Sequence, residues 1–269
     1  MGQDVREPPF FFAKPADAIV ADGGTVPYPS LTKDMHHEVE LVVALKSGGR
    51  NIKTEKALDC IYGYGVGIDL TRRDLQIASR DIKRPWEIGK AFDYSAPCGP
   101  LRAASEIGHP EKGRITLKVN GKVRQDGNLD QMIWKVPEII SKLSEIVELA
   151  AGDIIMTGTP SGVAATVAGD KIEWRDRTCR HAARRHRRAV KVTRIRETRR
   201  RLSYLIPPSF HAPSAASLRH GTVIRDQAVS EIRRPGPVRW NRNRDDALKG
   251  DSIRLGDHPW PPLIASLCG

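Results

Sequence analysis

Over residues 1–174, apolar and polar residues alternate in short runs, as expected of a chain with many strands. The run at 37–45, HEVELVVAL, is rich in β-branched residues and has no Gly or Pro, which predicts a strand. The run at 62–70, YGYGVGIDL, alternates glycine with larger residues, which is typical of a strand that another backbone approaches closely. The pattern therefore predicts two strands, and the first is apolar enough to be buried.

A hairpin and one long helix are also predicted. Asn120-Gly121 lies between the strand-like runs 115–119 and 122–124, and a tight hairpin turn needs positive φ at both central positions. Pro137 opens a helix that runs to about Glu148. The apolar residues on one face of this helix are Ile139, Ile140, Leu143, Ile146 and Val147. Many short strands with few helices predict a strand-rich α+β fold rather than βαβ winding.

Two carboxylates stand two positions apart at the start of the first strand. Glu38 and Glu40 would point to the same face, which in an edge strand would simply be an acidic face in water. The apolar residues 41–45 that follow indicate a buried strand instead, where two carboxylates need a cation. Asp69, at the end of the glycine-rich strand, offers a third oxygen ligand. Three such carboxylates suit a hard divalent ion, Mg²⁺ or Mn²⁺.

The charge of the chain divides it into two parts. The 269 residues carry 44 Lys+Arg and 32 Asp+Glu, a formal charge of +12. Residues 1–174 hold 22 basic and 24 acidic residues, whereas residues 175–269 hold 22 basic residues, 20 of them Arg, and only 8 acidic ones. We therefore expect one domain over 1–174 and an Arg-rich tail over 175–269.

Several classes of protein are excluded by composition. No apolar stretch approaches the roughly 18–20 residues that span a bilayer, and no secretory signal precedes the first strand. The cysteines at 60, 98, 179 and 268 have neither a disulfide framework nor metal-ligand spacing. These features predict a cytoplasmic protein without a membrane partner.

Five segments resemble the fumarylacetoacetate hydrolase family. They are HHEVELVVAL (36–45), GYGVGIDLTRRDLQ (63–76), RPWEIGKAFDYSAPCGP (84–100), LKVNGKVRQDG (117–127) and GDIIMTGTPSGV (152–163). The resemblance covers residues 5–173 in order and is strongest to the short branch that holds fumarylpyruvate hydrolases and acylpyruvases. It implies a mixed β-roll, usually dimeric, which agrees with the strand-rich pattern.

The resemblance also implies a role for individual residues. Glu38, Glu40 and Asp69 match the three metal ligands, and Lys90 matches the active-site lysine. Arg73 and Gln76 match substrate-contacting positions, and Thr159 matches the residue that holds the substrate carboxylate. His36 and His37 are expected to support the ligand strand or to lie at the surface rather than to act as bases.

The implied activity is metal-dependent hydrolysis of a carbon–carbon bond in a 1,3-diketo acid. The expected reaction converts fumarylpyruvate, a 2-oxo acid, to fumarate and pyruvate in the breakdown of aromatic compounds. Within the family, an acylpyruvase, an oxaloacetate decarboxylase or an isomerase is the alternative. From another class, the alternative is a basic nucleic-acid-binding protein with an inert enzyme-like domain.

Two departures from the family pattern change these expectations. The resemblance implies a His–Glu base on a lid ahead of the Phe run at 10–12, but only Met1 to Glu7 lead into that segment and no His precedes His36. We therefore expect weak hydrolysis or none.

The second departure is the tail at 175–269. It can be interpreted as a nucleic-acid-binding appendage, a disordered basic tail or the product of a shifted reading frame. The abrupt change to Arg-rich composition favours the last. We expect this tail to make little contact with the rest and to bind nucleic acid only non-specifically.

Overall fold

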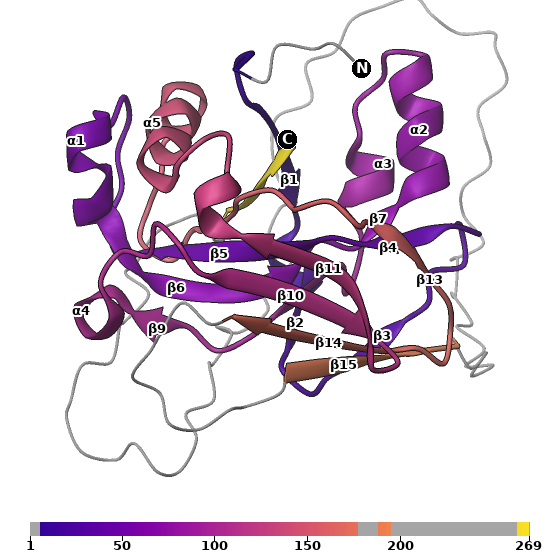
Figure 1. The fold of residues 1–269 in the computed structure, drawn as a ribbon. Coiled ribbons are helices and arrows are strands. Elements are labelled where there is room, and N and C mark those ends of the chain that lie inside the picture. The colour runs from indigo at the N-terminus through magenta and orange to yellow at the C-terminus, as the bar shows by residue number, and fades with distance from the viewer. Residues whose placement is uncertain (1–5, 177–187, 195–262, 269) are drawn as a thin grey trace, which may run out of the picture. The chain divides into compact units, whose positions relative to one another are not determined.

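The computed structural model describes residues 6–176, 188–194 and 263–268 (Figure 1). Among these residues the strands form three sheets. The main sheet has the order β1-β16-β12-β5-β6-β8-β2, with β9 also paired to β6. Its strands are β1 (Phe10–Lys14), β2 (Ile19–Ala21), β5 (Val39–Leu45), β6 (Ile61–Ile68), β8 (Ala96–Cys98), β9 (Arg102–Ala103), β12 (Ile154–Met156) and β16 (Ile264–Cys268).

Two smaller sheets accompany the main one. The second has the order β11-β10-β14-β15-β3 and the third the order β13-β4-β7. Their strands are β3 (Thr25–Pro27), β4 (Met35–His37), β7 (Thr71–Arg72), β10 (Arg114–Val119), β11 (Lys122–Asn128), β13 (Ala164–Thr166), β14 (Lys171–Asp176) and β15 (Arg188–Thr193). The strand-rich α+β fold expected from the sequence is confirmed.

The helices of the described residues are short apart from two. They are α1 (Thr54–Ala57), α2 (Arg73–Asp81), α3 (Glu87–Lys90), α4 (Ala104–Ile107) and α5 (Val136–Ile146), with 3₁₀ turns at Ala16–Ala18, Leu58–Cys60 and Leu129–Gln131. α1 packs beside α5, and α2 packs beside α3 (Figure 1). Nowhere in the described ranges is a helix long and apolar enough to cross a membrane.

The predicted pair of strands forms the centre of the main sheet. Every residue of β5 is buried, and β5 pairs antiparallel with β6 along its whole length. The glycines of β6 do allow a close backbone approach, because a Cβ atom at Gly63 would lie 2.1 Å from the carbonyl oxygen of Arg102. At Gly67 the same atom would lie 2.9 Å from the carbonyl oxygen of Pro97.

The predicted hairpin and helix are present. β10 pairs with β11 around Asn120 and Gly121, whose φ angles are 50° and 80°. α5 buries Ile139, Ile140 and Leu143, as the helical spacing predicts. Ile146 is exposed, so the predicted apolar face is wrong at this position, because the helix ends there.

Trp174 joins the second sheet to the main one. Its side chain extends from β14, is 1% exposed, and donates a hydrogen bond of 3.0 Å from Nε1 to the carbonyl oxygen of Val66 in β6. The composition changes just after this residue, but β14 continues to Asp176.

The expectation that residues 175–269 make little contact with the rest is wrong for two segments. β15 pairs with both β14 and β3, and it buries Val190 and Val192 on one face. β16 lies between β1 and β12, where Ile264, Ala265 and Leu267 are buried. Both segments carry enough apolar side chains to pack as strands against the core. The rest of the expected tail lies outside the described residues, and the boundary at residue 174 stays a prediction.

Candidate active site

Three buried carboxylates converge where β5 and β6 meet. Glu38 occupies the break between β4 and β5, and Glu40 follows in β5. Asp69 comes directly after β6, and its backbone N–H donates to the Glu38 carbonyl oxygen at 2.8 Å. One oxygen from each of the three side chains lies within 4.8 Å of the others. The convergence predicted from the sequence is therefore present.

Lys90 places its ammonium group among these carboxylates. Its Nζ atom lies 2.7 Å from Glu38 Oε2, from Asp69 Oδ2 and from Thr71 Oγ1. Burial alone would lower the pKa of Lys90, but the charges of Asp69 and Glu38 raise it above its ordinary value. All three N–H donors of the ammonium are engaged, so Lys90 is a fixed positive charge rather than a proton acceptor.

Among the three carboxylates, Glu40 has the fewest partners that compensate its negative charge. It is 1% exposed and accepts a hydrogen bond of 2.8 Å from the backbone N–H of Gly158. Burial, with the charges of Asp69 and Glu38, raises the pKa of Glu40 well above its ordinary value. A buried carboxylate in this state gains from a nearby cation, and three oxygen donors suit a divalent metal. The side chains present therefore fit such an ion.

Lys14 is a site residue that the sequence analysis did not single out. It extends from β1, and its Nζ atom forms an ion pair of 2.8 Å with Asp69 Oδ1. The same ammonium donates to Ser95 Oγ at 2.9 Å and to the Leu70 carbonyl oxygen at 3.2 Å. Asp69 is thus held between two buried ammonium groups, and these lower its pKa although burial alone would raise it. The only sequence signal is a lysine two positions after an aromatic run, FFFAKP.

Arg73 and Gln76 belong to the first two turns of α2. The Arg73 guanidinium forms an ion pair with Glu38 and donates to Gln76 Oε1. A Cβ atom at Gly89 would lie 2.8 Å from Gln76 Cβ, so glycine allows α3 to pack directly on α2. This contact places Lys90, the next residue of α3, beside the carboxylates.

Thr159 lies on the opposite wall, in the loop that follows β12. Its hydroxyl donates to the Val39 carbonyl oxygen at 2.9 Å and accepts from Gln125 Nε2 at 2.8 Å. A cavity of about 270 Å³ opens between this loop and the carboxylates. Its lining residues are Glu38, Glu40, Arg73, Gln76, Lys90, Thr159, Pro160, Ser161, Val163 and Leu267.

The cavity brings together the residues that the sequence analysis grouped. Asp69 is not among the lining residues, but it is buried in contact with Lys90. Leu267 of β16 lines the cavity, and Ser266 Oγ lies 3.3 Å from Asp69 Oδ2. The roles of these residues as ligands or substrate contacts stay predictions.

Neither His36 nor His37 lines this cavity. His36 pairs with Asp34 at 2.9 Å near the surface. His37 is fully buried, its Nδ1 lies 2.9 Å from Gln125 Oε1, and burial lowers its pKa. The geometry agrees with a surface position for His36 and a supporting role for His37.

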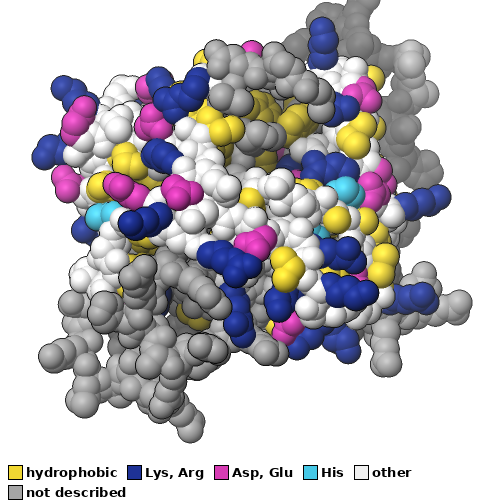
Figure 2. All heavy atoms as spheres, in the orientation of Figure 1, with side chains coloured by type: hydrophobic (Ala, Val, Ile, Leu, Met, Phe, Trp, Pro, Cys, Tyr) yellow, Lys and Arg dark blue, Asp and Glu magenta, His cyan; other side chains and the backbone are white. Residues whose placement is uncertain are grey.

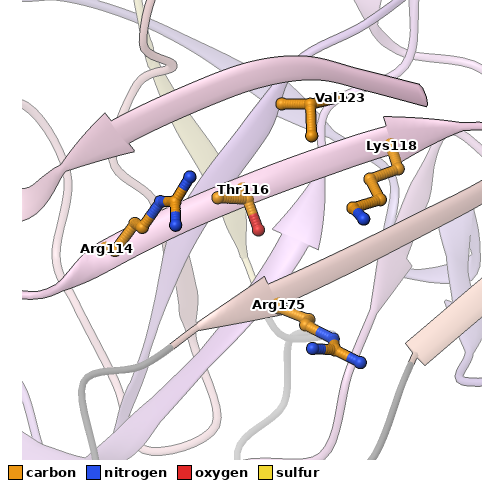
Figure 3. A pocket seen from close by; sticks show the side chains of 5 residues that line it. All are labelled: Arg114, Thr116, Lys118, Val123 and Arg175. Atoms are coloured by element: carbon orange, nitrogen blue, oxygen red, sulfur yellow. The ribbon is translucent and has the colours of Figure 1, made fainter. Parts of the chain in front are cut away.

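A second hollow, of about 140 Å³, lies on the second sheet (Figure 3). Arg114, Thr116 and Lys118 line it from one face of β10, Val123 from β11 and Arg175 from β14. Arg114 is already paired with Asp126. Figure 2 shows Lys and Arg side chains across this view of the molecule, with acidic side chains among them. The hollow has cationic groups but no carboxylate among its lining residues.

Comparison with known proteins identifies the family. A match to the family described as fumarylacetoacetate (FAA) hydrolase, C-terminal, extends over residues 1–225. The chain belongs to this family. A fumarylpyruvate hydrolase of Ralstonia sp is 45% identical over 166 residues, which cover 62% of this chain and 86% of that protein.

A solved structure and a second relative extend the comparison. The fumarylpyruvate hydrolase of Pseudomonas aeruginosa, in complex with Mn²⁺ and pyruvate, matches with a TM-score of 0.66 and 47% identity, over 70% of this chain and 80% of that one. A mitochondrial oxaloacetate tautomerase of Rattus norvegicus is 39% identical over 173 residues, 64% of this chain and 78% of that protein. The predicted resemblance to the fumarylpyruvate hydrolase branch is confirmed. The prediction that the chain is an enzyme, a hydrolase acting on carbon–carbon bonds, is confirmed as well.

Proposed function

We propose that the chain hydrolyses a carbon–carbon bond in a 1,3-diketo acid with the help of a divalent metal, Mg²⁺ or Mn²⁺. The substrate we propose is fumarylpyruvate, a 2-oxo acid, cleaved to fumarate and pyruvate. The observation that carries this proposal is a buried acidic triad, two members of which line one cavity together with Arg73, Gln76, Lys90 and Thr159.

The reaction needs stabilisation of negative charge. Water adds to the distal carbonyl carbon, and the bond between that carbon and the neighbouring methylene breaks. The electron pair of this bond passes to the enolate of pyruvate, which then takes up a proton. A divalent ion held by Glu38, Glu40 and Asp69 would supply Lewis-acid stabilisation of the developing enolate.

The side chains of the cavity supply fixed positive charge. Lys90 and Arg73 both line it, and both contact Glu38. Each is therefore oriented before substrate arrives, which is the condition for electrostatic catalysis. Gln76 lies beside Arg73 and adds a polar amide at the same wall. Thr159 faces them from the far side.

The lining residues also support a second candidate, keto–enol tautomerisation of oxaloacetate. Tautomerisation passes through an enolate but needs no attacking water. No histidine occurs among the described residues that line the cavity, and Lys90 is held as an ammonium ion. The identity of 39% to an oxaloacetate tautomerase favours this candidate over a binding function.

A paired assay separates the two candidates. Purified protein is given fumarylpyruvate or the enol form of oxaloacetate, with Mg²⁺, with Mn²⁺ or with EDTA. The proposal predicts loss of the fumarylpyruvate enol absorbance with equimolar fumarate and pyruvate, and no turnover in EDTA. Turnover of oxaloacetate alone, or turnover that survives EDTA, would contradict it.

Substitutions connect this activity to the cavity. Lys90→Gln should lower kcat by about 10²–10³-fold, the usual effect of losing one group that stabilises transition-state charge. Lys53→Gln serves as the control because Lys53 is exposed and remote from the cavity. Equal rates for the two variants would remove Lys90 from the mechanism. We also propose the homodimer that the family resemblance implies, which light scattering tests.

A further inference from the structure

Gln125 connects the ligand strand to the loop that forms the far wall of the cavity. It belongs to β11 and is completely buried. Its Oε1 accepts from the Val39 backbone N–H at 3.0 Å and contacts His37 Nδ1 at 2.9 Å. Its Nε2 donates to Thr159 Oγ1 at 2.8 Å and to the Pro160 carbonyl oxygen at 2.9 Å. All four hydrogen-bonding positions of the amide are thus used.

The orientation of this amide follows from its backbone partners. The Val39 N–H can only donate and the Pro160 carbonyl can only accept, so the oxygen must face Val39 and the nitrogen must face Pro160. His37 Nδ1 must then carry a proton, since an amide oxygen only accepts. Rotating the amide by half a turn would place like groups against each other at Val39 and at Pro160.

The two halves of the loop are held by different groups. Thr157 donates from its N–H and its hydroxyl to the Leu41 carbonyl oxygen, at 3.2 and 3.1 Å, and the next residue carries the N–H that binds Glu40. Pro160 is instead held by Gln125, and Thr159 is held by Gln125 and by the Val39 carbonyl oxygen. Loss of the Gln125 amide would therefore loosen this wall, leaving it one hydrogen bond to Val39, while the contact to Glu40 remains.

We propose that Gln125 is a positioning residue that fixes Thr159 and Pro160 as one wall of a 2-oxo acid site. It does not line the cavity, so it acts through the loop. The Thr159 hydroxyl already donates to the Val39 carbonyl oxygen, so it can meet a ligand only as an acceptor. For ligand binding, the position of the wall therefore matters more than a hydrogen bond from this hydroxyl. This inference rests on the proposed function, because it assumes that a 2-oxo acid occupies the cavity.

Binding of pyruvate to the Mn²⁺-loaded protein, measured by calorimetry, tests this role. Gln125→Met keeps the length of the side chain without its hydrogen bonds and should weaken pyruvate binding about tenfold or more, which is at least ~1.4 kcal/mol. Mn²⁺ affinity in the absence of pyruvate should fall clearly less than pyruvate affinity, because Gly158 still contacts Glu40, although the Val39 N–H loses its acceptor. Lys53→Met is the control, since Lys53 is exposed and does not line the cavity.

Two further variants separate positioning from stability. Thr159→Val should weaken pyruvate binding as Gln125→Met does, and the double variant should bind no more weakly than the weaker single one. Gln125→Glu keeps the acceptor oxygen for Val39 but cannot donate to Pro160, so it should resemble Gln125→Met. For active protein, the expected change is a higher KM for fumarylpyruvate at nearly constant kcat.

The contrary outcomes are equally definite. Unchanged pyruvate affinity in Gln125→Met, additive losses in the double variant, or Mn²⁺ affinity that falls as much as pyruvate affinity would overturn the positioning role. If the wild-type protein binds pyruvate but does not cleave fumarylpyruvate, the proposed function fails while the Gln125 comparison still stands.

Discussion

Lys14 Nζ lies 2.8 Å from Asp69 Oδ1, and neither side chain is more than 1% exposed. The contact is an ion pair without a well-aligned hydrogen bond at that oxygen. The other oxygen of Asp69 faces Lys90. Each oxygen of this carboxylate therefore has its own ammonium neighbour: Oδ1 lies beside Lys14, and Oδ2 accepts from Lys90.

Removal of the Lys14 charge should destabilise the protein. Lys14→Met leaves the Asp69 carboxylate buried with one cation fewer, and breaking a buried pair typically costs about 3–5 kcal/mol. Urea unfolding in EDTA measures the loss. The exposed Lys53→Met should change the free energy of unfolding by less than about 0.5 kcal/mol. Similar urea midpoints for the two variants would show that the buried Asp69 carboxylate does not need the Lys14 charge for stability.

Removal of the Glu40 charge should have opposite effects with and without metal. In EDTA, Glu40→Gln should be at least as stable as wild type, because it replaces a buried carboxylate whose pKa is strongly raised. With Mn²⁺ at 100 times its Kd, wild type should gain about 2.7 kcal/mol of stability. Glu40→Gln should gain much less, as followed by thermal unfolding.

The control for this experiment is Glu55→Gln, which alters an exposed carboxylate in α1. It should respond to Mn²⁺ as wild type does. An equal metal response in Glu40→Gln would remove Glu40 from the ligand set.

Substitution in β16 should test whether this strand belongs to the core. Leu267→Ala removes a side chain that is 5% exposed and lines the cavity, and such a change costs about 2–5 kcal/mol. Leu31→Ala is the matched control, because Leu31 is 67% exposed. Urea midpoints that shift equally in the two variants would mean that residues 263–268 are not packed in the sheet.

Asp74 should contribute stability that depends on pH. Burial alone would raise its pKa, but hydrogen bonds from the Thr32 hydroxyl and the backbone N–H of Lys33 lower it below the ordinary value of 3.8. The unfolded chain therefore binds a proton at higher pH than the folded chain. This contribution is complete above the unfolded pKa and is lost as the pH falls through the folded pKa.

The corresponding variant is Asp74→Asn. At pH 6 it should be less stable than wild type by about 1 kcal/mol, the usual value of a hydrogen bond. Below pH 3.8 the difference should narrow, as measured by urea unfolding at several pH values. The exposed Asp17→Asn is the comparison. A difference that stays constant or widens on acidification would contradict the assignment.

Local patterns predicted the centre of the site well. The apolar run after Glu40 and the glycines before Asp69 describe two adjacent buried strands, and adjacency brings the carboxylates together. The predicted strand at 37–45 is interrupted at Glu38, because β4 leaves the main sheet and pairs with β13 and β7. No period in the sequence marks that change of partner.

Non-local contacts explain what the sequence did not reveal. A lysine such as Lys14 looks like a surface residue until its strand has a neighbour, and that neighbour is β16. Ala189 to Val192 alternate small, apolar and charged residues, but this short alternation stands within an Arg-rich segment. Composition over many residues therefore obscured two strands that a local pattern could have indicated.

The place of β16 has a consequence for the order of folding. β5 and β6 are close in sequence and can pair early, whereas Phe10 pairs with Cys268, and pairing at such separation is slow. Among the described strands, β1 meets the main sheet only through β16. We therefore expect Lys14 to reach Asp69 late, after the carboxylates have come together. Until then the clustered carboxylates repel one another, and a metal ion present during refolding should speed the assembly of the site.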